Sequence, residues 1–249
     1  MLVDMHSRLV PLRGNRYEND EEALRILKSA AADGITHIIA TPVYRNDSYI
    51  DNEQAIGNHV NELNSKLLRL DIPVTVFEGM EIVLYEKIVQ DIKLKLLPLA
   101  DSEKYIFISF QVNKVPSFAL NVFFEMQLMG YIPVIANVER NIEFISNPKK
   151  LLEFVNKGAL VHVGAASILG LNGRNIQKGA LKLCRSGLVQ LISSASHESK
   201  SHPSLLKPAY DYLGKKLSPK MVDYYIRNAE SVINGTDFHI QNPMKYSKK

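Results

Sequence analysis

The chain has 249 residues, a length that α/β barrels commonly use for a single domain. Apolar residues make up 46% and charged residues 22%, proportions that are typical of globular proteins and exclude a mainly disordered chain. The net charge of +4 is spread along the sequence, so no nucleic-acid-binding surface is expected.

The first residues and the single cysteine indicate the compartment. Residues 1–6 have no basic region followed by an apolar stretch, and no apolar run elsewhere has membrane-spanning length. Cys184 lies in an apolar, helix-like stretch and has no second cysteine to pair with. We therefore expect a cytoplasmic protein with a buried thiol and no membrane insertion.

Short runs of β-branched and aromatic residues recur along the chain, and each precedes a helix-like segment. They predict seven strands, at residues 2–5, 37–41, 74–77, 105–110, 132–136, 160–163 and 189–193. Asn19 and Asp20 can cap a first helix that ends before Gly34, and Asp51 begins the second. Further helices are predicted at residues 117–129, 148–156, 175–185 and 219–228.

Strands that alternate with helices predict parallel pairing and right-handed crossovers. Seven such units favour a single-domain α/β barrel over residues 1–240, followed by a flexible tail at 241–249. A doubly wound open sheet is the alternative that this pattern leaves open. In both architectures ligands bind beyond the carboxyl ends of the strands.

Residues of types that can bind metals or anions follow several predicted strands. They are His6 and Arg8 after the first, Arg45 after the second, Glu81 after the third, Arg140 after the fifth, and His197 after the seventh. Metal ligands and cations brought together by the strand ends indicate a site for an anion.

Short motifs at these strand ends resemble the polymerase-and-histidinol-phosphatase (PHP) family. DMHSR at 4–8 resembles Asp-x-His-x-His, ATPVY at 40–44 resembles Ala-Thr-Pro-His-His, and GMEI at 79–82 resembles Gly-x-Glu-Ile. IANVERN at 135–141 resembles Ile-Ala-His-Pro-Glu-Arg-Asn, and SASH at 194–197 resembles Ser-Asp-Ala-His. The order of motifs, together with segments outside the site, is similar to the Gram-positive branch of manganese-dependent tyrosine-protein phosphatases.

The resemblance implies a PHP-type (β/α)7 distorted TIM-like barrel and phosphatase chemistry. In the family, divalent metals on these loops activate water for attack on phosphorus, and two arginines bind the phosphate. Of the corresponding ligands, this chain keeps His6, Glu81 and His197. The other ligand positions read Arg8, Asn15, Val43, Ser109, Asn137 and Ala195. Of the phosphate arginines Arg140 is kept, and the second position reads His202.

These substitutions imply a degenerate metal site. Valine and alanine side chains offer no lone pair, and Arg8 brings a permanent cation to a metal-ligand position. The resemblance therefore implies no three-metal cluster. One ion, Mn²⁺ or another divalent metal, on His6, Glu81 and His197 stays open, because three protein ligands and a water form a usual catalytic set.

The predicted function is that of a pseudophosphatase without a metal cofactor. Arg8, Arg45 and Arg140, helped by His202, would bind a phosphotyrosine-bearing or acidic protein tail without cleaving it. The resemblance implies a bacterial tyrosine kinase of capsule or exopolysaccharide synthesis as partner. The alternatives are a weak tyrosine-protein phosphatase with one metal ion, and an inert structural or interaction barrel.

Structural roles also stay open for the same residues. His6 could be a hydrogen-bonded core histidine, and Glu81 could form an ion pair with Arg8. Arg140 could pair with Glu139 or Glu143. The sequence assigns no site role to His162.

Overall fold

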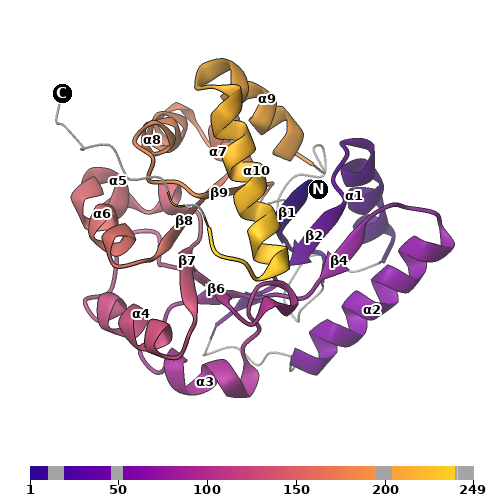
Figure 1. Ribbon diagram of the computed structural model, residues 1–249, viewed down its shortest axis with the longest axis horizontal. Helices are drawn as coiled ribbons and strands as arrows, with labels where there is room; N and C mark the ends of the chain where they lie inside the picture. Colours follow the sequence, from indigo (N-terminus) through magenta and orange to yellow (C-terminus); the bar gives the residue numbers. More distant parts are fainter. Residues whose placement is uncertain (11–19, 46–52, 195–203, 239, 241–249) are drawn as a thin grey trace.

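The structure is a computed structural model that describes residues 1–10, 20–45, 53–194, 204–238 and 240 (Figure 1). Several expectations fall outside these ranges. They concern Asn15, Asn19, Asp51, Ala195, His197, His202 and the tail at 241–249.

The strands of the described ranges form two parallel groups. The first group has the order β1-β2-β4 and consists of β1 (Val3–Ser7), β2 (His37–Ala40) and β4 (Thr75–Phe77). The second has the order β3-β5-β6-β7-β8-β9. It consists of β3 (Val43–Tyr44), β5 (Glu81–Val83), β6 (Tyr105–Ser109), β7 (Ile132–Ile135), β8 (Leu160–Gly164) and β9 (Leu191–Ser193).

The predicted α/β class with a parallel barrel-like sheet is confirmed, whereas the number of strands is corrected. The seven predicted strands correspond to β1, β2, β4, β6, β7, β8 and β9. The structure adds β3 and β5, of two and three residues, where the sequence analysis placed the loops after the second and third predicted strands. As a consequence Glu81 is the first residue of β5 and lies on a strand, not in a loop.

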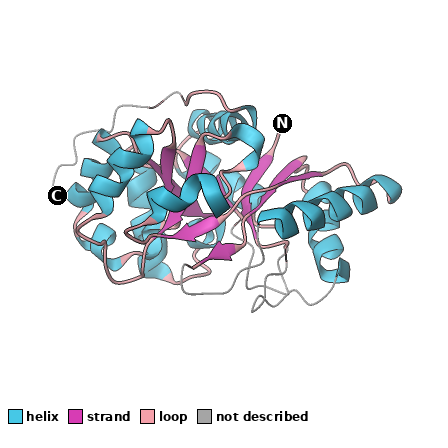
Figure 2. Cartoon of the chain, turned by 90° about the horizontal axis from the view of Figure 1, so that it is seen from below, coloured by secondary structure: helices cyan, strands magenta, loops and turns pink. Residues whose placement is uncertain are grey.

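Helices surround the curled sheet (Figures 1 and 2). In the described ranges they are α1 (Asp20–Ala32), α2 (Glu53–Arg69), α3 (Ile88–Lys95), α4 (Ala119–Leu128), α5 (Ile142–Ser146), α6 (Pro148–Asn156), α7 (Ala165–Leu169), α8 (Arg174–Arg185), α9 (Leu206–Lys216) and α10 (Pro219–Asn234). Single 3₁₀ turns lie at η1 (Ala100–Ser102) and η2 (Val138–Arg140). No helix among the described residues combines the length and apolar character needed to cross a membrane.

Alternate residues of the central strands separate two apolar cores. Tyr105 and Phe107 of β6 face the barrel interior with Val3 and Met5, whereas Ile106 and Ile108 pack under the surrounding helices. The alternation is expected for a sheet that is covered by helices outside and filled by side chains inside.

The two ends of the barrel are closed differently. Helix α10 packs on the amino-terminal end, where the Asn228 amide donates to the carbonyl of Gln190, just before β9. At the seam between the first and last strands, Asp4 of β1 accepts hydrogen bonds from the Ser194 backbone N–H (2.9 Å) and hydroxyl. The carboxyl ends of the strands carry the pocket that is described next.

Candidate anion-binding site

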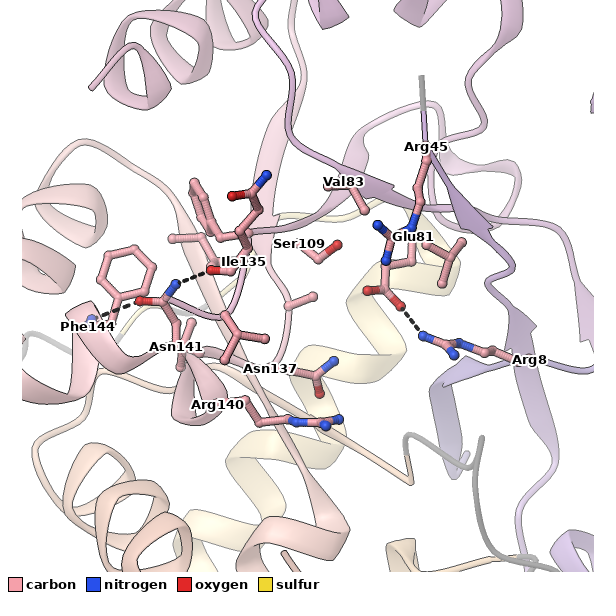
Figure 3. A pocket seen from close by; sticks show the side chains of 16 residues that line it. Arg8, Arg45, Glu81, Val83, Ser109, Ile135, Asn137, Arg140, Asn141 and Phe144 are labelled. Carbon is pink, nitrogen blue, oxygen red and sulfur yellow. Dashed lines mark hydrogen bonds and ion pairs between the residues drawn. The ribbon is translucent and has the colours of Figure 1, made fainter. Parts of the chain in front are cut away.

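A pocket with a volume of about 570 Å³ opens at the carboxyl ends of the strands (Figure 3). Three of its lining residues are the cations Arg8, Arg45 and Arg140. Val83, Phe110 and Val112 add an apolar part, and Ser109, Gln111, Asn137 and Asn141 add polar groups. The structure thus brings together all three predicted phosphate-binding arginines.

Arg8 and Glu81 form an ion pair in this pocket. The Arg8 Nη2 lies 3.5 Å from the Glu81 Oε2, and their side chains are 26% and 8% exposed. The carboxylate comes from β5, whereas the guanidinium follows β1. The structural role left open for Glu81, a pair with Arg8, is therefore present.

His6 lies beneath this ion pair. Its imidazole is fully buried, with Nδ1 2.6 Å from the Thr41 hydroxyl and Nε2 3.4 Å from the Glu81 Oε2. Burial, followed by the charges of Arg8 and Arg140, lowers the pKa of His6 to about 3. The ring is therefore neutral at physiological pH, with one nitrogen next to the Thr41 hydroxyl and the other next to the Glu81 carboxylate.

Arg140 is directed into the pocket by a tight turn. It is the last residue of η2, which follows Asn137 in the left-handed conformation (φ 48°). The pairs with Glu139 or Glu143 that the sequence left open are not among the ion pairs of the described residues. Glu143 instead binds Lys150 (2.5 Å), and Glu139 accepts a hydrogen bond from Ser167. Figure 3 shows Arg140 extending beside Asn137.

The described residues do not fit a multi-metal centre. Among them, no group of three or more His, Cys, Asp or Glu side chains is placed to hold a metal ion. His6 and Glu81 converge, but the Arg8 guanidinium stands against the same carboxylate oxygen. The pocket wall has Val43 and Asn137 at two positions that the sequence resemblance assigned to further metal ligands. The donor set suits an anion better than a cluster of dications.

Two site residues were missed by the sequence analysis. His162 of β8 accepts the Asn137 backbone N–H at Nδ1 (3.2 Å), and its ring lies against those of His6 and Phe107. Glu139, buried beside Arg140, bonds to β8 and α7. The sequence signal for His162 was its place in a predicted strand, and that for Glu139 was its place in the IANVERN motif at 135–141.

Several solved structures share this fold. Histidinol phosphate phosphatase from Lactococcus lactis is 15% identical with a TM-score of 0.52, covering 96% of this chain and 94% of its own. At that identity the likeness shows the fold alone. A second solved structure has a TM-score of 0.91 and 31% identity to this chain. It comes from work on YwqE of Bacillus subtilis and CpsB of Streptococcus pneumoniae, which are named there as metal-dependent tyrosine phosphatases. The match covers 99% of this chain and 100% of that one.

The sequence comparisons define the family. The tyrosine-protein phosphatase YwqE of Bacillus subtilis is 31% identical over 249 residues, covering 100% of this chain and 98% of the relative. The tyrosine-protein phosphatase CpsB of Streptococcus pneumoniae is 21% identical over 238 residues, covering 93% and 98%. The chain belongs to the capsular polysaccharide synthesis family CpsB/CapC, whose sequence profile matches residues 2–234. The predicted family is confirmed.

Proposed function

We propose that this chain is a pseudophosphatase that binds a phosphotyrosine-bearing or acidic protein tail in its arginine-lined pocket. The observation that carries the proposal is the position of Arg8. Its guanidinium lies 3.5 Å from Glu81, a metal-ligand residue of the PHP motifs, and supplies a fixed cation there. The pocket then needs no metal cofactor to attract a phosphate.

The charges in the pocket favour a phosphate dianion. Arg8, Arg45 and Arg140 are permanently charged, whereas Glu81 is the only carboxylate among the described lining residues and His6 is neutral. Arg45 and Arg140 form no ion pair within the described part of the chain, so their N–H groups can bind phosphate oxygens in the forked geometry of guanidinium.

An unmade hydrogen bond also supports an anion. The Arg8 Nε is buried and has no hydrogen-bond partner among the described residues. Such groups are rare because they cost about 1–3 kcal/mol each. A phosphate oxygen that reaches this N–H would restore the missing bond.

The size and apolar part of the pocket favour an aromatic phosphate over a free one. A volume of about 570 Å³ is within the usual range for small-ligand sites. Phe110 and Val112 can contact a tyrosine ring while the arginines hold its phosphate. An open, charged pocket supports binding over the alternative of an inert barrel.

The partner follows from the family. Because relatives are named tyrosine-protein phosphatases and the family is that of capsular polysaccharide synthesis, we infer a phosphorylated tail of a bacterial tyrosine kinase in capsule or exopolysaccharide synthesis. Such a tail would meet this protein in the cytoplasm.

One observation favours the alternative of a weak tyrosine-protein phosphatase with one metal ion. His6 Nε2 and Glu81 Oε2 lie 3.4 Å apart, so both could face one ion if the Arg8 guanidinium moved aside. This alternative predicts about one equivalent of bound manganese and slow turnover.

Two measurements test the proposal. Metal analysis of protein purified without chelator should show no stoichiometric metal. Calorimetry should show that a phosphotyrosine peptide binds about tenfold or more tightly than its unphosphorylated form. Arg140→Ala should remove that preference, whereas Arg185→Ala, which changes an exposed cation of α8 outside the pocket, should not. One equivalent of manganese together with turnover of the peptide would instead establish the phosphatase.

A further inference from the structure

We propose that Glu139 is a positioning residue whose buried carboxylate holds the η2 turn against β8 and α7 and thereby aims Arg140 into the pocket. The inference deepens the proposed function, since it concerns how one anion-binding arginine is oriented. It assigns Glu139 no contact with the ligand.

Glu139 is anchored on the side of the turn away from the pocket. Its side chain is 2% exposed, and Oε1 accepts hydrogen bonds from the Gly164 backbone N–H (3.1 Å) and the Ser167 hydroxyl (2.6 Å). The Ser167 Oγ in turn accepts from the Asn172 amide (3.0 Å). A buried carboxylate without hydrogen bonds is costly, so these two bonds oppose any movement that would break them and leave the group buried and unpaired.

A second anchor holds the beginning of the turn. The Asn137 backbone N–H donates to His162 Nδ1 (3.2 Å), which leaves the proton of the neutral ring on Nε2, 2.7 Å from the Ser193 hydroxyl oxygen. The Arg140 N–H closes the turn on the Asn137 carbonyl (3.0 Å). The groups that bind the turn lie on β8 and on α7, which follows β8. The turn follows β7, so these bonds fix it to the neighbouring strand of the sheet.

The geometry of the turn links this anchor to Arg140. A 3₁₀ turn has about three residues per turn, so consecutive side chains project about 120° apart. With Glu139 held toward α7, Arg140 must leave the turn in another direction, and Figure 3 shows it in the pocket. Asn137 adopts a left-handed conformation that costs a non-glycine residue energy, so the turn needs support to persist.

The expected benefit is pre-organisation. Arg140 is exposed and forms no ion pair among the residues that the structure describes, so its own side chain contributes little to its position. An arginine on a fixed turn loses less freedom when it binds phosphate than one on a mobile loop.

The test compares Glu139→Ala, Glu139→Gln and Asn64→Ala in the full chain. Glutamine keeps an oxygen for the Gly164 and Ser167 donors, whereas alanine keeps none. Asn64→Ala is the matched control, because Asn64 also makes two hydrogen bonds, both to the Val76 backbone (2.8 Å each), on β4 and away from the pocket. All three variants are measured well below their melting temperatures.

Two readouts separate positioning from general destabilisation. Hydrogen exchange of a peptide covering residues 137–144, without ligand, should quicken in Glu139→Ala and stay near wild type in Glu139→Gln and Asn64→Ala. Inorganic phosphate should bind about tenfold more weakly to Glu139→Ala, with affinity largely kept in the other two variants. In an Arg140→Ala background, Glu139→Ala should cause no further loss of affinity.

The inference and the proposed function fail in different ways. Unchanged exchange and unchanged phosphate affinity in folded Glu139→Ala would overturn the positioning role. If Glu139→Ala exchanges faster than wild type but the wild-type protein binds no phosphate, the anchoring role of Glu139 is supported and the proposed function is overturned. If Glu139→Ala does not fold, Ser167→Ala removes one donor to the same oxygen and should show the same effects at smaller size.

Discussion

The Arg8 guanidinium and the Glu81 carboxylate lie 3.5 Å apart across the pocket, where Arg8 follows β1 and Glu81 begins β5. The same Glu81 oxygen lies 3.4 Å from His6 Nε2. One carboxylate therefore faces a permanent cation and a neutral imidazole, and removing the cation changes both the stability and the charge of the site.

Arg8→Ala should lower stability and weaken phosphate binding together. The pair is only partly buried and its atoms are 3.5 Å apart, so we expect a cost of about 1–2 kcal/mol, between exposed and buried pairs. That corresponds to a fall of about 2–8 °C in melting temperature. Thermal unfolding with and without phosphate measures both effects. Identical melting curves for wild type and Arg8→Ala, unchanged by phosphate in both, would show that Arg8 contributes neither to stability nor to phosphate binding.

Hydrolysis of p-nitrophenyl phosphate with added manganese should be at least ~10³-fold slower than by an intact relative such as YwqE. The reason is that Val43, Ser109 and Asn137 of the pocket wall offer poor metal donors or none. Steady-state rates of both proteins in one buffer provide the comparison. Manganese-dependent turnover near the rate of the relative, abolished by Glu81→Ala, would contradict this expectation.

Arg8→His should not restore phosphatase activity. It recreates the His-x-His pair with His6 and removes the fixed cation, but the positions of Val43, Ser109 and Asn137 are unchanged. Manganese titration of this variant, followed by its turnover, is the measurement. A gain of several hundredfold over wild type would mean that Arg8 alone blocks catalysis.

Asp4 should make stability depend on pH between about 4 and 6. Burial raises the pKa of its carboxyl from 3.8 to about 6, against the opposing hydrogen bonds from Ser194. In this window the native state holds a proton that the unfolded chain releases, so rising pH favours unfolding, by up to ~1.4 kcal/mol per pH unit. This contribution is fully present below pH 3.8 and is lost as the pH rises through about 6.

Urea unfolding of wild type and Asp4→Asn at several pH values isolates this contribution, because other titrating groups are common to both proteins. The stability of wild type should fall relative to the variant from pH 4 to 6 and then run parallel to it. A difference that does not vary with pH would show that Asp4 is ionised throughout.

Cys184 should resist thiol reagents in the native protein. It is fully buried, and burial raises the pKa of its thiol to about 12, so little thiolate forms at pH 8. Labelling with a disulfide reagent at pH 8 should be slow in the native protein and complete after unfolding in urea. Fast labelling without denaturant would mean that α8 opens readily.

The sequence by itself located seven of the described strands, six of the described helices and the end of the barrel at which the site lies, but it missed helices α3, α5, α7 and α9. Apolar and β-branched runs located seven strands, although two of them, β4 and β9, have only three residues. Parallel strands also bring their carboxyl ends to one side, which predicted that Arg8, Glu81 and Arg140 would meet. Strands β3 and β5 were missed, because the sequence analysis assigned their residues to the loops after the second and third predicted strands.

Only the tertiary structure decided which charges interact. By sequence, Arg140 had two neighbouring carboxylates, Glu139 and Glu143, as equal candidates. The η2 turn instead buries Glu139 against Ser167, Glu143 reaches Lys150, and Arg140 is left to the pocket. These choices depend on side-chain directions that are set by contacts between β8, α7 and the turn, because neighbours in sequence need not point the same way.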